Sequence, residues 1–469
     1  MGGRHAVTPL RSAASFSVIL PAVFGGRLRH VSSVARALLL SAVLLIGCGP
    51  QPTLPPGSFD PVRIGVITPL TGDLGTDGLG WANAARLAAR ELNAAGGPLP
   101  GRPIELVVVD DETNSARGQP LARRLIEQDG VVAIVGAAAS SVSLEVAQVA
   151  TEARIPQISC CSTSDLLTSF NENLADESDR YFFRTAPPDS LQSLVVAIAA
   201  ADLACTRLAI LHIDDGYGEP FGLGIAAAFE ADGGEVVARV PFPEEQASYT
   251  AEVAQIRDAM PDCVALVAFP VSGGRILRDW TSLAARPTVT WIGTDGVRAP
   301  GFVDEVGDAA LLDGFFGTSP ITDGATPEYN DFHDRYEAVF GEAPVPFSSN
   351  QYDAVALLGL AIAYAESTDG PAIRDALRSV ASPPADRGVV VSGRLAEGLA
   401  EIREGREVDY LGASGNTDFN AAGDVVTPYE IWRYDAPDSS TPCSSSTAVP
   451  NNRGRFCRFR TLTAEEIDP

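Results

Sequence analysis

Short apolar runs alternate with amphipathic stretches in the first part of the chain. The apolar runs predict strands at 62–67, 104–109, 131–135 and 156–159. Between them, apolar residues recur at helical spacing, as from Trp81 to Leu92 after a glycine-rich loop that spans Gly72–Gly80. Continuous apolar runs are typical of parallel strands that are buried on both faces. The pattern therefore predicts an α/β lobe.

A second series with the same alternation begins near Asp189. It predicts helices at 189–203, 218–232, 250–259 and 273–284, and strands at 207–213, 235–240, 264–269 and 288–293. Two successive series of this kind indicate two α/β lobes, each with a parallel central sheet. Further helices are expected near 327–340, 350–366 and 370–380, and residues 429–434 alternate like an edge strand.

The N-terminus has the pattern of an export signal. Arg27, Arg29 and Arg36 precede the apolar run Ala37–Gly47, which at eleven residues is too short to cross about 30 Å of hydrocarbon as a helix. Leu45–Cys48 resembles the lipobox of bacterial lipoproteins, which implies that residues 1–47 are removed and Cys48 is acylated. An ordinary signal with an incidental cysteine is the alternative. The proline-rich residues up to 61 predict a tether.

The composition excludes several partners. The chain has 469 residues with 34 basic residues, all of them arginine, against 60 acidic ones, and a net charge of −26. Such an acidic protein repels phosphate backbones, so nucleic acid is not an expected partner. Only four histidines occur, which argues against a histidine metal site, and no cofactor is expected.

Six cysteines remain after Cys48, and an exported protein meets an oxidising compartment. Cys205 and Cys263 each precede a strand, and those two strands are neighbours in a doubly wound lobe, so we predict a Cys205–Cys263 disulfide. We also predict that Cys443 and Cys457 close a C-terminal tail.

The adjacent pair Cys160 and Cys161 remains open between a vicinal disulfide and two buried free thiols. Alternatively, all six cysteines serve as small apolar side chains.

No catalytic constellation is recognisable. The chain lacks a Gly-x-Ser-x-Gly elbow, a phosphate-binding P-loop and a His-Glu-x-x-His motif, and the spacing of Asp110–Glu112 does not fit a calcium loop. We therefore expect a protein that is not an enzyme. A cell-surface hydrolase that uses His212, at the end of a predicted strand, is the remaining catalytic alternative.

Polar groups follow the strands of the first predicted lobe. Ligands of open α/β sheets bind beyond the carboxyl ends of the strands. Ser140 and Ser141 at a helix start and Thr163 in the next turn offer hydroxyls and free N–H groups that suit a carboxylate. Helix capping is the alternative role for these three residues.

The second predicted lobe offers the opposite chemistry. Asp295 follows a strand and suits an ammonium, and Tyr217 and Phe269 are placed to cover a side chain. Alternatively, Tyr217 packs in the core and Asp295 caps a turn. Together the two lobes predict a trap for a zwitterion.

The chain resembles the branched-chain amino-acid-binding proteins, the type I periplasmic substrate-binding components of ABC importers. The resemblance spans about residues 62–435 and rests on the order of seven segments: Ile64–Gly72, Glu91–Gly97, Val108–Glu112, Ile155–Ser159, Phe183–Thr185, Tyr217–Glu219 and Asn350–Ala354. It implies two Rossmann-like lobes joined by three crossovers near 187, 319 and 411. The first lobe would comprise 62–187 and 319–411, the second 188–318 and 412–436, followed by the tail 437–469.

The resemblance also implies roles for single residues. The family's carboxylate contacts fall on Ser140, the backbone of Cys161, and Thr163, its ammonium contact falls on Asp295, and Tyr217 takes the covering aromatic position. Two residues depart from the family pattern. Phe269 stands where a tyrosine is usual, and Asp77 stands where the branched-chain binders place an aromatic residue against the ligand's side chain.

The function expected from this resemblance is capture and delivery. The protein would bind an amino acid or a related small zwitterion, amide or carboxylate, and pass it to an ABC permease while a lipid on Cys48 holds it at the membrane. A ligand sensor with the same fold is the main alternative. An acid at position 77 argues against leucine as the ligand and leaves its identity open.

Overall fold

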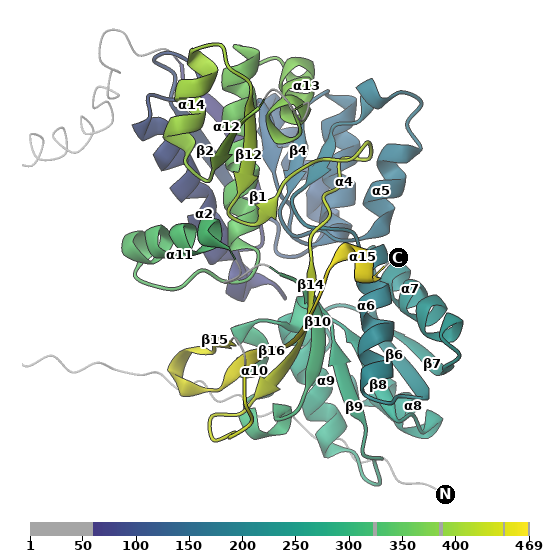
Figure 1. Cartoon of the computed structure of the whole chain (residues 1–469). Coiled ribbons are helices and arrows are strands. Elements are labelled where there is room, and N and C mark those ends of the chain that lie inside the picture. The colour runs from purple at the N-terminus through teal and green to yellow at the C-terminus, as the bar shows by residue number, and fades with distance from the viewer. Residues whose placement is uncertain (1–59, 322–325, 384–387, 444–445, 468–469) are drawn as a thin grey trace, which may run out of the picture. The chain divides into compact units, whose positions relative to one another are not determined.

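The computed structural model describes residues 60–321, 326–383, 388–443 and 446–467 (Figure 1). The expected signal, the lipidation site Cys48 and the tether up to residue 59 lie outside the described residues. Within the described part of the chain, no helix is both long enough and apolar enough to cross a membrane.

The first sheet has five parallel strands in the order β2-β1-β3-β4-β5. The strands are β1 Val62–Thr68, β2 Ile104–Asp110, β3 Ala133–Val135, β4 Gln157–Ser159 and β5 Phe182–Arg184, joined by helices α2 Gly75–Ala94, α3 Gly118–Glu127, α4 Ser140–Glu152 and α5 Asp165–Glu172. In this order the chain reverses direction across the sheet at β1, and a ligand crevice forms outside the carboxyl ends of the strands there.

Later segments of the chain complete this first lobe. They are α11 Pro327–Phe340, α12 Ser348–Ala365, α13 Gly370–Ala381 and α14 Leu395–Arg403, with a small sheet of β11 Val389–Ser392, β12 Val408–Gly412 and β13 Gly415–Asn416. Helix α12 is buried from Ser348 to Ala363 because it packs against α2, α13 and the first sheet. Its largely apolar sequence is what a helix covered on all sides requires.

The second sheet repeats the strand order of the first in its parallel part, β10-β9-β8-β6-β7. The strands are β6 Arg207–Ile213, β7 Glu235–Phe242, β8 Cys263–Val267, β9 Thr290–Gly293 and β10 Phe316–Pro320, and the helices are α6 Asp189–Asp202, α7 Gly218–Ala231, α8 Thr250–Ala259, α9 Pro270–Ser282 and α10 Pro300–Val306. The expected class, two Rossmann-like α/β lobes with parallel central sheets, is confirmed.

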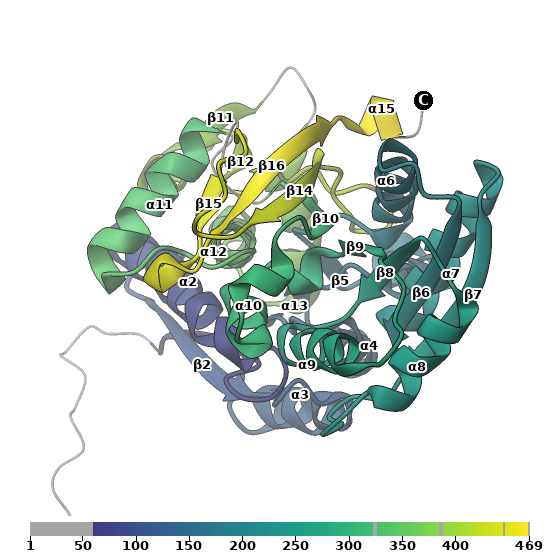
Figure 2. The same ribbon diagram turned by 90° about the horizontal axis from the view of Figure 1, so that it is seen from below.

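The second sheet also carries an antiparallel extension. Strands β14 Tyr429–Asp435, β16 Arg455–Leu462 and β15 Ser446–Ala448 add to the edge of β10 one after another (Figure 2), and a last helix, α15 Ala464–Ile467, follows. The residues after 436 were expected to form a separate tail, but Phe456 and Leu462 are buried in the second lobe. The tail joins the lobe because apolar and arginine side chains alternate along β16, so that one face can be buried.

The third crossover differs from the expected position. Asn171 Nδ2 donates to the carbonyl of Ala422 at 2.7 Å, and Arg184 Nε lies 2.6 Å from Asp424 Oδ1 in a fully buried ion pair. The chain therefore stays with the first lobe until Asp424 and crosses before Tyr429, so the boundary near 411 was set too early. No apolar run marks residues 413–428, and the sequence pattern gave no signal for this path.

The structure contains three disulfides. Cys205 is joined to Cys263, whose strand β8 is the direct neighbour of β6, and Cys443 is joined to Cys457. The adjacent residues Cys160 and Cys161 form a vicinal disulfide, which was one of the two possibilities left open.

We predict that the two longer-range disulfides differ in their contribution to stability. They close segments with sequence separations of 58 and 14 residues. From the loss of loop-closure entropy in the unfolded chain, Cys205–Cys263 should stabilise the fold by about 4 kcal/mol and Cys443–Cys457 by about 3 kcal/mol. Urea unfolding of the two double Cys→Ala variants measures this. A larger loss for Cys443→Ala with Cys457→Ala would contradict the ordering.

Candidate functional site

A cavity with about 470 Å³ of atom-free space lies at the carboxyl ends of the strands, with walls from both lobes. Seven of the residues that the sequence singled out for ligand binding line it: Asp77, Ser140, Cys161, Thr163, Tyr217, Phe269 and Asp295. Ser141, the other serine considered as a carboxylate donor, is buried outside the cavity. The seven lining residues come from six separate loops or helix starts of the chain. The folding of both lobes is therefore what brings them together.

The hydroxyl side of the cavity is built on the start of α4. The residue at the N-cap is Ala139, and no side chain caps this helix, so its first N–H groups are without a capping acceptor. Ser140 is buried, and its hydroxyl oxygen accepts the N–H of Ser164 at 3.2 Å, which leaves the hydroxyl hydrogen available. A helix N-terminus of this kind favours an anion.

The next turn contributes Thr163 and Cys161. The cap of α5 is Ser164, whose hydroxyl accepts the N–H of Leu166, so Thr163 is not a capping residue. Thr163 is buried at the cavity. The N–H of Cys161 donates to the Ser159 hydroxyl at 3.3 Å, so this amide is already engaged within the turn. The two hydroxyls and the α4 amides are the stronger anion donors here.

The opposite wall carries the acid Asp295 after β9. Burial raises the pKa of Asp295 to about 6, although hydrogen bonds from Gln192 and Tyr217 favour its charged form. The Tyr217 hydroxyl lies 2.9 Å from Thr294 Oγ1 and donates to Asp295 Oδ1 at 3.3 Å. Tyr217 thus orients the carboxylate, which is placed to accept hydrogen bonds from an ammonium.

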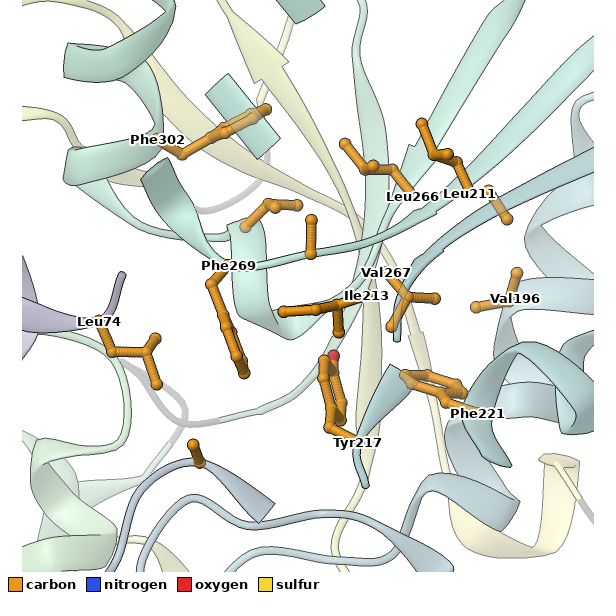
Figure 3. Packing of buried hydrophobic residues seen from close by; sticks show 14 of the residues in the cluster. Leu74, Val196, Leu211, Ile213, Tyr217, Phe221, Leu266, Val267, Phe269 and Phe302 are labelled. Carbon is orange, nitrogen blue, oxygen red and sulfur yellow. The ribbon is translucent and has the colours of Figure 1, made fainter. Parts of the chain in front are cut away.

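Aromatic rings form the apolar part of this wall. Tyr217 and Phe269 stack with their ring centroids 5.4 Å apart and their planes 10° apart. Figure 3 shows the two rings side by side, with Leu74 of the first lobe across the open space from Phe269. These surfaces can cover the apolar portion of a ligand.

Asp77 and Trp81 share one face of α2, since they are four residues apart. Sequence reasoning missed Trp81 as a lining residue because it placed Gly72–Gly80 in a loop, whereas the helix begins at Gly75. Gly78 allows this early start, because a side chain there would collide with the carbonyl of Pro69. The Trp81 indole N–H donates to the carbonyl of Pro346 at 2.7 Å.

A second buried acid lies beside Asp295 and was not singled out. Asp189, at the start of α6, is fully buried, and the only side chain that favours its charged form by a hydrogen bond among the described residues is Thr163. Burial and the neighbouring charge of Asp295 raise its pKa well above the usual value. In the sequence, Asp189 looks like an ordinary acid in the first turn of a helix, so nothing in the pattern marks it.

Asp73 bridges the two lobes next to the cavity. Its Oδ1 accepts the N–H of Val271 at 2.7 Å and that of Ser272 at 3.1 Å, at the N-terminus of α9. The carboxylate belongs to the first lobe and the helix to the second. Since hydrogen bonds to a charged group at a helix N-terminus are favourable, this contact helps to hold the two lobes in the arrangement seen here.

His212 does not reach the cavity. Its ring is fully buried on β6, with Nδ1 3.0 Å from the carbonyl of Ile213 and Nε2 3.2 Å from Arg239. Among the described residues, the one cluster with metal-ligand geometry is Cys205, Asp262 and Cys263, and its two cysteines are joined in a disulfide.

The fold and the cavity match a known family. A family model described as a periplasmic binding protein matches residues 61–394. The chemotactic signal transduction system substrate-binding protein BasB of Halobacterium salinarum is 27% identical over 398 residues, 79% of this chain and 86% of BasB. The Leu/Ile/Val-binding protein BraC3 of Rhizobium johnstonii is 29% identical over 343 residues, 72% of this chain and 88% of BraC3.

A solved structure supports the same fold. The leucine-binding protein LivK of Thermotoga maritima superimposes with a TM-score of 0.68 at 21% identity, over 86% of this chain and 99% of LivK. At this identity the likeness is one of fold.

We predict that Asp189 destabilises the protein as the pH rises. A carboxyl whose folded pKa is raised stabilises the fold below its unfolded pKa, near 4, and this stabilisation is lost as the pH rises through the folded pKa. The melting temperature of Asp189→Asn minus that of the wild type should therefore be larger at pH 8 than at pH 4. The exposed Asp232→Asn controls for the loss of one negative charge, and an equal advantage for both variants would refute the prediction.

Proposed function

Because the chain belongs to the periplasmic binding protein family, we propose that it captures an amino acid or a related small zwitterion or amide between its two lobes. The observation that carries this proposal is the cavity itself. Ser140, Thr163 and the uncapped N-terminus of α4 form one wall of the cavity and can donate hydrogen bonds to an anion. Asp295, with its hydrogen-bond partner Tyr217, lies in the opposite wall. A zwitterion presents both complementary charges.

Capture is coupled to closure in this proposal. Each lobe alone offers partners for one end of the ligand, so a closed clamp gains contacts that an open one lacks, and ligand shifts the population towards it. The Asp73 contact with the start of α9 adds to the stability of that closed state. The closed form would then dock on an ABC permease and release the ligand there.

The proposal places the protein outside the cytoplasm, attached by lipid. The family and the signal pattern of residues 1–47 support export, and the lipobox resemblance supports acylation of Cys48. A singly acylated protein binds a membrane weakly, whereas several chains on one cysteine hold it stably. The lipid would keep the loaded protein near its permease.

Sensing is the second candidate function. BasB, which resembles this chain over 79% of its length, is named for a chemotactic signal transduction system. In this alternative the same clamp would report occupancy to a membrane receptor. Deletion of the gene for this protein distinguishes the two functions, because uptake of the ligand would fall only if the protein serves transport.

The first test is a calorimetric screen of amino acids against their 2-oxo acids and their decarboxylated amines. We expect binding of zwitterions only. Ser140→Ala should weaken binding by about 10- to 100-fold, because it removes a hydrogen bond to a charged group. The adjacent Ser141, buried but outside the cavity, is the matched control, and Ser141→Ala should stay within about threefold. Failure of every zwitterion to bind would reject the function.

The pH dependence of binding provides a second test. An ammonium needs Asp295 in its charged form, and the pKa of Asp295 is about 6. Affinity should therefore fall by up to about tenfold per pH unit as the pH drops below 6, and level off above it. Asp295→Asn should weaken binding at pH 7.5 by about 10- to 100-fold and remove this part of the profile. Because the charge of Asp295 raises the pKa of Asp189, the comparison is made with Asp189→Asn present in both proteins. Asp77 titrates in both, and an unchanged profile would exclude the assignment.

A further inference from the structure

The ligand cavity adjoins a second, larger cavity that is open to solvent. Three residues line both: Asp77, Arg298 and Pro346. The outer cavity lies between the start of α2, helix α10, the segment before α12, and the C-terminal tail around β15. Figure 2 shows α2, α10 and β15 near one another on this side of the molecule. A ligand whose side chain passes Asp77 would enter this outer cavity.

Asp77 is the unusual group at the junction. Its side chain is 5% exposed, and no hydrogen bond or ion pair from the described residues reaches its carboxylate. Burial alone raises its pKa to about 7. A buried carboxylate without a partner is unfavourable in its charged form, so a ligand group that donates a hydrogen bond to Asp77 would be favoured here.

The other charged residues at the outer cavity differ in whether they are paired. Arg298 Nε lies 2.7 Å from Glu430 Oε1, and Asp304 Oδ1 lies 2.5 Å from Arg453 Nη1. Glu430 is also paired with Arg458. Burial is nevertheless the only influence on the pKa of Asp77, so no neighbouring cation in the described part of the chain compensates its charge. Glu342 is exposed and has no ion pair among the described residues. The uncompensated charge along the path from the inner to the outer cavity is negative.

We infer that the ligand is an amino acid with a long cationic side chain, whose guanidinium or ammonium group passes Asp77 into the outer cavity. This inference rests on the proposed function, since Ser140, Thr163 and Asp295 would hold the α-carboxylate and the α-ammonium. A guanidinium offers five donors and carries a permanent charge, so it satisfies Asp77 and reaches towards Glu342. An apolar side chain would leave the buried carboxylate without a donor.

L-Arginine and L-citrulline form a matched pair for the test, because citrulline has the same length and shape but no side-chain charge. We expect arginine to bind the purified protein about 10- to 100-fold more tightly than citrulline or leucine. Asp77→Asn should weaken the binding of arginine by the same factor and change the affinity for citrulline by no more than about threefold. The variant's melting temperature, which should not fall, verifies folding. Equal affinities in the wild type, or an unchanged arginine affinity in Asp77→Asn, would overturn the inference.

A second pair of variants tests the outer cavity. Glu342→Gln should weaken the binding of arginine by about threefold or more, as expected when an exposed ion pair with the ligand's side chain is lost. Glu337→Gln, exposed at the end of α11 and outside both cavities, removes the same charge and should change nothing. Equal effects of the two variants would overturn the passage of the side chain into the outer cavity.

Different outcomes would refute the cationic side chain and the proposed function. If leucine and citrulline bind as tightly as arginine, the zwitterion trap stands and the cationic side chain is refuted. If none of the three binds and no other zwitterion does, the proposed function itself is wrong.

Discussion

The ligand cavity and its walls hold more buried negative charge than the described residues neutralise. Asp295 accepts a hydrogen bond from Tyr217, Asp189 is favoured in its charged form by Thr163 and Arg184 only in part, and burial is the one influence on Asp77. Each charged form costs free energy in a buried site, and this is why burial raises all three pKa values. The same burial would strengthen the binding of a cation, because water does not screen the attraction between a cationic group in the site and a buried carboxylate.

The two sheets explain why a site of this kind is sensitive to closure. Both place their parallel strands so that the carboxyl ends face the crevice, and each contributes half of the polar groups. Asp73 reaches across to the N-terminus of α9, so the lobes share at least one hydrogen-bonded contact that does not involve a ligand. In the proposed function, closure would have a contribution from the protein and a contribution from the ligand, and the balance between them would set the affinity.

Much of this arrangement was predictable because buried parallel strands have a strong apolar signal and their carboxyl ends are where sites form. The seven lining residues were found in this way or by family resemblance. The short strands β5 and β10 were not found, since three to five residues with arginine, threonine and serine give no apolar run. Trp81 was missed because the helix that carries it starts inside a glycine-rich segment, and Asp189 because its burial depends on contacts distant in sequence.

The residues that line the cavity occupy two kinds of position in the fold. In the proposed function, the groups for the α-carboxylate and the α-ammonium lie at strand ends and helix starts, which are anchored to the two sheets. Asp77 instead lies on one face of α2 and makes no side-chain hydrogen bond with the described residues, so its replacement would change the cavity without breaking one. Under this proposal the fold would keep its contacts with the amino-acid backbone while residue 77 selects the side chain. In this chain that residue is an acid at the mouth of a second cavity, which favours a ligand longer and more positive than leucine.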